Sequence, residues 1–239
     1  MSQVELPSNW QIFEASAVVA QHACDKIMAL ANQAISEKGR FDFVTAGGST
    51  PNAIYALLAK LEQQQPKATK WKKWFIYVGD ERVLPAGDNE RNSQMLESHW
   101  LENSRIPKSN RFYMPTELGL QAAADFYRKV IAGVEFDLVL LGMGEDGHTA
   151  SLFPGHSSVS LGGVVCETQS PKPPLERLSL SYETLSSAKT VMKIVTGRSK
   201  SEALHAWLDD QDLPITRVKG VTETLVMVDQ EAIADLTDK

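Results

Sequence analysis

Residues 41–51 read Phe-Asp-Phe-Val-Thr-Ala-Gly-Gly-Ser-Thr-Pro, and this stretch gives the clearest indication of the fold class. Its first five residues are mostly aromatic or β-branched, which predicts a short strand, and the two glycines that follow predict a tight turn. Pro51 then opens a helical pattern with apolar residues at positions 53, 54, 57, 58 and 61. The stretch therefore indicates a strand, a glycine turn and a helix.

The same order of elements recurs along the chain. A long amphipathic helix is predicted at residues 15–37 and ends at Gly39, and apolar strands at residues 74–78 and 136–141 each lead into a polar turn with glycine. Further strands are expected at 163–167, 178–181, 191–196 and 224–228, and further helices at 93–101, 121–132 and 199–208. Alternating apolar strands and helices predict an α/β fold, a doubly wound, mostly parallel, Rossmann-like sheet with helices on both faces. We expect one domain spanning residues 1–239.

Composition narrows the function classes. The chain has 239 residues, 24 Lys and Arg against 30 Asp and Glu, a net charge of −6, and 43% hydrophobic residues. This composition excludes disorder and a disulfide scaffold as main themes, and the acidic balance disfavours a nucleic-acid partner. The apolar runs are shorter than the ~20 residues that cross a bilayer, so we expect no membrane partner and a cytoplasmic protein. The pattern leaves open whether the chain is a monomer or a homodimer.

Three polar turns follow predicted strands, and such turns meet at the carboxyl edge of a parallel sheet, where ligands bind. The first turn contains Gly47, Gly48, Ser49 and Thr50. Its glycines allow backbone amides to approach an anion, its hydroxyls add donors, and the following helix points its positive end at the turn. A phosphate is the expected ligand, and a plain structural turn is the alternative. Neither a Gly-x-x-x-x-Gly-Lys-Ser/Thr loop nor a Gly-x-Gly-x-x-Gly turn is present here, so nucleotides are not indicated.

The second turn, residues 79–82, places charged residues directly after an apolar run. Arg82 is a candidate to bind an oxyanion, and Asp80 is a candidate to accept sugar hydroxyls. The alternative is a solvated strand end.

The third turn is the most specific, with four glycines, two carboxylates and His148 within residues 142–155. Neutral imidazole is well suited to take a proton from water near pH 7, and neighbouring Asp146 is placed to orient it. The other histidines have no such setting and are interpreted as structural. No Gly-x-Ser-x-Gly elbow or His-Glu-x-x-His pattern is present, so we expect activated water, with no cofactor and no metal.

Two further cations follow later in the chain. Arg177 precedes a strand, and Lys200 lies in the first turn of a helix, where a lysine opposes the helix dipole unless an anion sits beside it. Ordinary surface charge is the alternative for each.

Taken together, residues 45–51, 78–82, 141–154 and 176–180 resemble the 6-phosphogluconolactonase family in order and spacing, and the resemblance runs from about residue 10 to about residue 233. It implies hydrolysis of 6-phospho-glucono-1,5-lactone to 6-phosphogluconate, the second step of the oxidative pentose phosphate pathway. The expected ligand is thus a small sugar phosphate lactone.

The lactonases resemble glucosamine-6-phosphate isomerase/deaminase, which shares the glycine turn, an Asp-Glu pair and an Asp-Gly-His loop. In the isomerase a glutamate follows the histidine loop where this chain has Phe153, and a tyrosine follows the Asp-Glu pair where this chain has Arg82. Both differences favour the lactonase. The lactonases often have a Ser-Asn pair about ten residues after Arg82, whereas this chain has Arg91-Asn92-Ser93, and no contact is assigned to that segment.

The resemblance and the residues together give a mechanism as a hypothesis. The 6-phosphate binds the turn from Gly47 to Thr50, and Arg177 and Lys200 also bind it. His148 acts as general base toward water with help from Asp146, and either Arg82 or the amides around Gly144 stabilise the oxyanion. A sugar-phosphate sensor without catalysis would not need His148.

Overall fold

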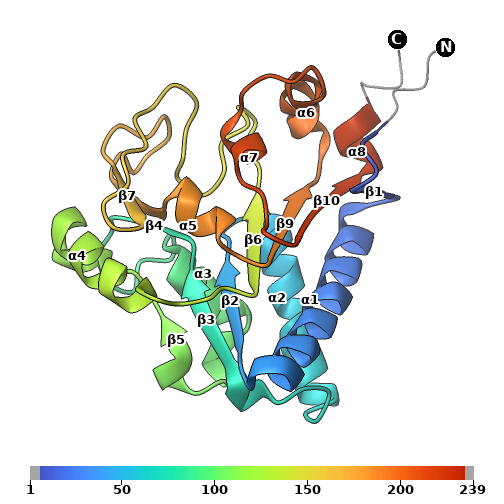
Figure 1. Ribbon diagram of the computed structural model, residues 1–239, viewed down its shortest axis with the longest axis vertical. Helices are drawn as coiled ribbons and strands as arrows, with labels where there is room; N and C mark the ends of the chain where they lie inside the picture. Colours follow the sequence, from blue (N-terminus) through green and yellow to red (C-terminus); the bar gives the residue numbers. More distant parts are fainter. Residues whose placement is uncertain (1–5, 235–239) are drawn as a thin grey trace.

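A parallel sheet forms the centre of the molecule (Figure 1). The computed structural model describes residues 6–234, and within this range seven strands pair in the order β1-β10-β9-β6-β2-β3-β5, each parallel to its neighbours. β2, β6 and β9 are buried along almost their whole length, as expected for strands covered on both faces. The bounds are β1 (Trp10–Phe13), β2 (Phe41–Thr45), β3 (Trp74–Val78), β5 (Arg111–Phe112), β6 (Leu138–Gly142), β9 (Thr190–Val195) and β10 (Glu223–Asp229).

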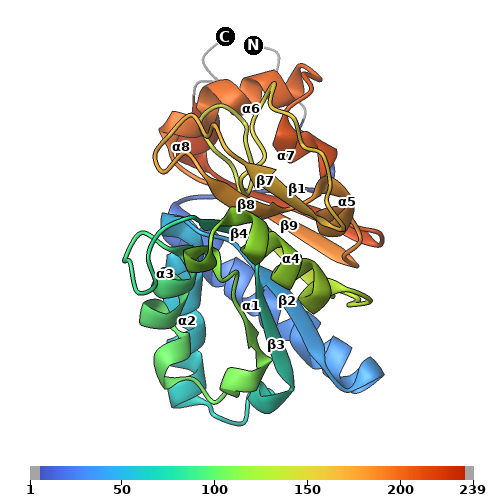
Figure 2. The same cartoon turned by 90° about the vertical axis from the view of Figure 1, so that its left-hand side faces the viewer.

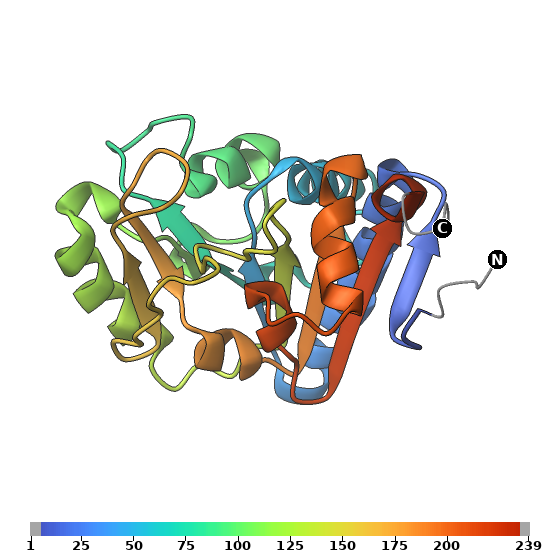
Figure 3. The ribbon, with the colours of Figure 1, turned by 90° about the horizontal axis from the view of Figure 1, so that it is seen from above.

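Two sets of elements cover the two faces of this sheet. α1, α2 and α3 pack on one face, while α4, a second small sheet and the later helices pack on the other. Figure 2 shows α4 on the side opposite α2, and Figure 3 shows α6 beside β9 and β10. The bounds are α1 (Ser16–Lys38), α2 (Ser49–Gln64), α3 (Asn92–His99), α4 (Leu120–Ile131), α5 (Tyr182–Ser186), α6 (Ser201–Leu208), α7 (Pro214–Arg217) and α8 (Gln230–Ile233).

The doubly wound α/β fold expected from the sequence is confirmed, but β1 and β5 of the main sheet are not predicted, and the strands predicted at 163–167 and 178–181 belong to a second sheet. β4 (Asp80–Arg82), β8 (Arg177–Leu180) and β7 (Val164–Glu167) form a separate antiparallel sheet. The sequence treats Asp80 and Arg82 as part of a turn, whereas the structure pairs them with β8. The connection from residue 168 to residue 176 has no helix and is too short for a parallel crossover, which explains why β7 and β8 are antiparallel.

The helices that flank β2 end and begin at glycines. α1 ends at Gly39, whose φ of +82° is left-handed and whose N–H donates to the Ile35 carbonyl at 3.1 Å. α2 begins at Ser49, two residues before the proline that predicts its start, with Gly48 as its N-cap residue. The helix N-terminus therefore lies directly at the end of β2.

The register of the parallel strands brings their carboxyl ends together. Thr45 of β2 is level with Val78 of β3, and Gly142 of β6 is level with Ile194 of β9. The three polar turns predicted from the sequence therefore lie side by side. The expected domain limits, residues 1 and 239, lie outside the described residues.

Candidate active site

A cavity of about 260 Å³ opens at the carboxyl ends of β2, β3, β6 and β9, and we call it the strand-end cavity. Asp146 contacts the His148 ring and is the candidate that does not line the cavity. All other site residues predicted from the sequence line it, namely Gly47, Gly48, Ser49, Thr50, Asp80, Arg82, His148, Arg177 and Lys200. The structure thus brings together residues that are more than 150 positions apart in the sequence.

His148 is held by its own loop and by one aromatic ring. Its Nδ1 lies 2.5 Å from Asp146 Oδ1, and the same oxygen accepts the His148 backbone N–H at 3.1 Å. The ring lies against Phe153, with centroids 4.7 Å apart. A Cβ at Gly144 would lie 2.0 Å from His148 Nδ1, so the loop needs glycine there. A proton on Nδ1 donated to Asp146 leaves Nε2 as the proton acceptor.

Asp146 keeps its negative charge beside this ring. Partial burial acts to raise the pKa of Asp146, but the charge of His148 and hydrogen bonds from its backbone and ring lower it, and the net pKa lies below the ordinary value. An ionised Asp146 stabilises the imidazolium that forms when His148 takes a proton.

The glycine turn is fixed to the elements around it. The Tyr55 hydroxyl accepts the Ala46 N–H at 2.9 Å and donates to the Ala46 carbonyl at 2.7 Å. The Thr50 and Thr196 hydroxyl oxygens lie 2.6 Å apart, which joins the start of α2 to the end of β9. A rigid turn at the N-terminus of a sixteen-residue helix is a suitable anion site.

Three predicted cations surround the cavity. Arg82 of β4 lies opposite Arg177 of β8 in the antiparallel register. Burial and the charge of Arg82 lower the pKa of Arg177, while Asp80 and Glu167 act against this. Burial also lowers the pKa of Lys200, which Glu145 and Asp146 partly offset. These unfavourable charges are relieved when an anion binds.

Asp80 is nine-tenths buried and receives hydrogen bonds from two sides. Ser151 Oγ donates to Asp80 Oδ2 at 2.7 Å, and Asn92 Nδ2 donates to Oδ1 at 3.0 Å and to the Asp80 carbonyl at 2.8 Å. The side chain is thus fixed at the cavity wall rather than free in solvent.

The sequence analysis missed several residues that line the cavity, namely Asn92, Glu145, Lys172 and Thr196. Thr196 could have been predicted, because it is the last residue of the strand expected at 191–196, at the edge of the sheet where ligands bind. Asn92 lies at the start of α3, where the buried Glu81 carboxylate accepts its N–H at 2.7 Å. Lys172 comes from an irregular loop whose position no local pattern indicates.

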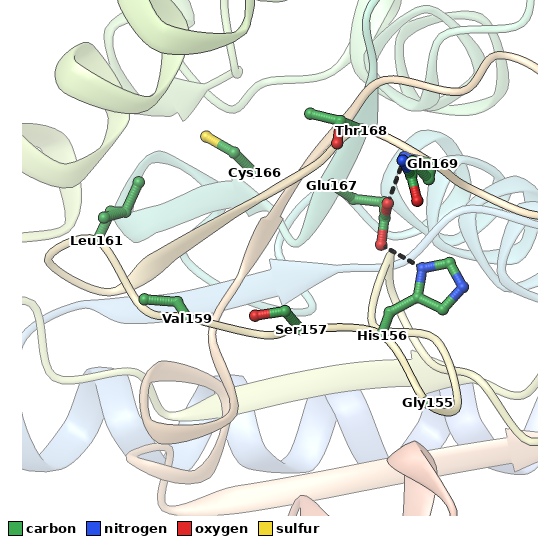
Figure 4. Close-up of a pocket in the computed structure, with 9 residues that line it drawn as sticks. All are labelled: Gly155, His156, Ser157, Val159, Leu161, Cys166, Glu167, Thr168 and Gln169. Carbon is green, nitrogen blue, oxygen red and sulfur yellow. Dashed lines mark hydrogen bonds and ion pairs between the residues drawn. The ribbon is translucent and has the colours of Figure 1, made fainter.

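A second hollow of about 460 Å³ lies between residues 155–161 and 166–169, and we call it the side hollow (Figure 4). His156 Nδ1 lies 2.9 Å from Glu167 Oε2, and the Gln169 N–H donates to Glu167 Oε1 at 2.5 Å. None of the predicted site residues lines it. The His156 and Glu167 side chains in this hollow are already paired with each other.

Within residues 6–234, no cluster of three or more His, Cys, Asp or Glu side chains is arranged to hold a metal ion. Over the same range no helix is long and apolar enough to cross a membrane. The cytoplasmic location and the lack of a nucleic-acid partner remain predictions.

The chain is similar to known proteins over nearly its whole length. A family model for glucosamine-6-phosphate isomerases/6-phosphogluconolactonase matches residues 14–227. A probable 6-phosphogluconolactonase 3, chloroplastic, of Oryza sativa subsp. indica is 31% identical over 249 residues, covering 95% of this chain and 75% of that protein. The GDH/6PGL endoplasmic bifunctional protein of Homo sapiens is 37% identical over 220 residues, covering 82% of this chain and 27% of that protein. The crystal structure of 6-phosphogluconolactonase from Thermotoga maritima has a TM-score of 0.84 at 27% identity, covering 92% of this chain and 98% of that one.

Proposed function

This chain belongs to the glucosamine-6-phosphate isomerase/6-phosphogluconolactonase family, and from that premise we propose that it hydrolyses 6-phospho-glucono-1,5-lactone to 6-phosphogluconate with His148 as general base. The relatives that match most of the chain carry the name of the lactonase, so the chain is an enzyme of that type. The observation that carries the mechanism is one cavity that holds the Asp146-supported His148 together with an anion-binding turn and three cations.

The substrate phosphate binds the amides and hydroxyls between Gly47 and Thr50. Arg177 and Lys200 line the same cavity and neutralise the negative charge of the phosphate. Fixing this remote group aligns the lactone carbonyl with His148, and such positioning supplies part of the barrier reduction.

Water then attacks the carbonyl carbon while His148 Nε2 takes its proton. The resulting imidazolium is stabilised by Asp146, whose lowered pKa keeps it charged. Collapse of the tetrahedral intermediate breaks the bond to the ring oxygen, which takes the proton back from His148. General-base assistance of this kind is typically worth ~10²–10⁴ in rate.

Of the two groups considered for the oxyanion, Arg82 is favoured. The Gly144 N–H already donates to the His148 carbonyl at 2.8 Å, so that amide is not free. Arg82 lines the cavity and donates one guanidinium N–H to the Glu90 carbonyl. Its remaining donors suit a developing negative charge.

Phe153 supports hydrolysis over sugar isomerisation. The ring is 3% exposed and lies against His148, so this position provides no carboxylate to share proton transfers with the histidine. Isomerisation moves protons between carbon and oxygen atoms and needs such a group beside the sugar.

The test follows the decay of freshly generated 6-phosphogluconolactone with and without the protein, with glucosamine 6-phosphate as a second substrate. Spontaneous ring opening is subtracted from each trace. We expect faster lactone decay and no turnover of the amino sugar. Turnover of glucosamine 6-phosphate without faster lactone decay would replace the lactonase proposal with the isomerase.

A further inference from the structure

The loop that carries His148 packs against Leu213, which does not line the strand-end cavity. Gly147 lies between Asp146 and His148 with a left-handed φ of +80°. A Cβ on Gly147 would lie 2.8 Å from Leu213 Cδ1 and 3.1 Å from Leu213 Cβ. Since Cβ atoms do not approach other carbon atoms so closely, Leu213 fills the space that any larger residue at position 147 would need.

The backbone of Gly147 is held at the same place. The Ile215 N–H donates to the Gly147 carbonyl at 3.1 Å, and the Ile215 side chain is fully buried. Gly147 in turn donates its own N–H to the Gly144 carbonyl at 3.1 Å. The loop therefore rests on the segment around Leu213 through both side-chain packing and a hydrogen bond.

The supporting segment is itself well fixed. The Thr216 N–H and hydroxyl both donate to the Leu213 carbonyl, at 2.9 and 2.7 Å. Arg217 binds the two Asp212 carboxylate oxygens at 2.6 and 2.5 Å. Pro214 occupies the first turn of α7, where its fixed φ suits the helix. Leu213 is thus held in place by contacts within its own segment.

We infer that Leu213 is a positioning residue for the Asp146–His148 pair. It does not line the strand-end cavity, and it acts by fixing Gly147, the residue between the two groups. The inference deepens the proposed function and rests on it. Its consequence is that loss of the leucine side chain misplaces the base while the phosphate contacts stay intact.

The kinetic test compares Leu213→Ala with Leu208→Ala. Both leucines are partly buried and pack against the same hydrophobic core, so the two truncations remove similar contacts. Only Leu213 provides the nearest atoms to Gly147. We expect Leu213→Ala to lower kcat by about 10- to 100-fold with little change in KM, because small displacements of a catalytic group are costly. We expect Leu208→Ala to change neither, and Leu213→Met, which keeps the volume, to restore kcat.

Hydrogen exchange tests the same inference without activity. We expect the backbone amides of Gly147 and His148 to exchange faster in Leu213→Ala than in the natural protein or Leu208→Ala. Equal kcat and equal exchange in the two alanine variants would overturn the inference, as would a loss confined to KM. If the natural protein does not hydrolyse the lactone but exchange rises only in Leu213→Ala, the positioning role stands and the proposed function fails.

Discussion

The strand-end cavity and the side hollow are each lined by one histidine that contacts a carboxylate, yet they differ in what surrounds that histidine. In the side hollow, Glu167 accepts hydrogen bonds from both His156 and the Gln169 N–H, and only two short segments form the walls. In the strand-end cavity, His148 faces cations and a glycine turn that come from several strand ends. The strand-end cavity is therefore the hollow whose cations and glycine turn suit a ligand.

Size does not identify the site in this molecule, because the two hollows are of comparable extent. The site is identified by cations that line the strand-end cavity and that nearby carboxylates only partly offset. Arg177 and Lys200 both have pKa values lowered first by burial, and each is further disfavoured by a neighbouring cation. Such a cost is retained where an anion binds and removes it.

Substitution of each histidine in turn tests whether the two hollows differ in function. His148→Ala should lower the enzymatic rate of lactone hydrolysis by ~10²–10⁴, because general-base assistance is lost. His156→Ala should leave kcat and KM unchanged, since its Nδ1 serves only Glu167. The measurement is lactone decay corrected for the spontaneous reaction. Similar losses from both variants would mean that the two hollows are not functionally distinct.

Substitution of Lys200 tests whether its positive charge serves to bind the substrate phosphate. Lys200→Ala should raise KM by roughly 10- to 100-fold with a smaller effect on kcat, because one charge-assisted hydrogen bond to the phosphate is worth about 1.5–3 kcal/mol. Lys129→Ala on the exposed face of α4 is the matched control and should change neither constant. A fall in kcat without a rise in KM would assign Lys200 to the chemical step instead.

The contrast between the two regions also shows what the sequence can predict. The strand, glycine turn and helix around Gly47 are local patterns, and the rule that ligands bind at strand ends predicts that Gly47, Asp80 and His148 meet. The antiparallel pairing of Asp80–Arg82 with Arg177–Leu180 is not local, and three charged residues give no strand signal.

The site residues that the sequence does not predict are likewise placed by contacts between segments that are far apart in the chain. Asn92 reaches the site because the buried Glu81 carboxylate fixes the start of α3 beside Asp80, a contact between segments that no spacing indicates. Lys172 is placed by a loop whose carbonyl groups bind Arg177. Leu213 supports the His148 loop from 65 positions away in the sequence. Local patterns thus locate the chemistry, whereas tertiary packing decides what holds it in place.

In the side hollow the carboxylate should matter for stability rather than for rate. Glu167→Ala leaves the His156 ring and the Gln169 N–H without their acceptor, and we expect a loss of about 1–3 kcal/mol in the free energy of unfolding. For a chain of this size that corresponds to about 2–4 °C in Tm for each kcal/mol. Arg177 lies opposite Glu167 in the β7–β8 register but stays protonated, so KM should not change. Thermal unfolding and lactone kinetics on the same sample separate the two effects.

The smallest expected effect concerns Lys193, a buried lysine that does not line the strand-end cavity. Lys193 of β9 is 2% exposed, its Nζ lies 4.8 Å from the Trp207 ring centre, and no carboxylate among residues 6–234 is within ion-pair distance. Burial and the charge of Lys219 lower the pKa of Lys193 to about 7, whereas an unfolded lysine titrates near 10.4. Between these values the unfolded chain binds a proton that the folded chain does not, so the free energy of unfolding rises with pH, by about 1 kcal/mol from pH 7 to pH 8.

Urea unfolding at both pH values should show this rise in the natural protein and not in Lys193→Met. The Lys193→Met variant should hydrolyse the lactone as fast as the natural protein does. An equal rise in both proteins would contradict the low pKa, and a loss of activity would show that a buried unpaired charge can serve the reaction without facing the cavity.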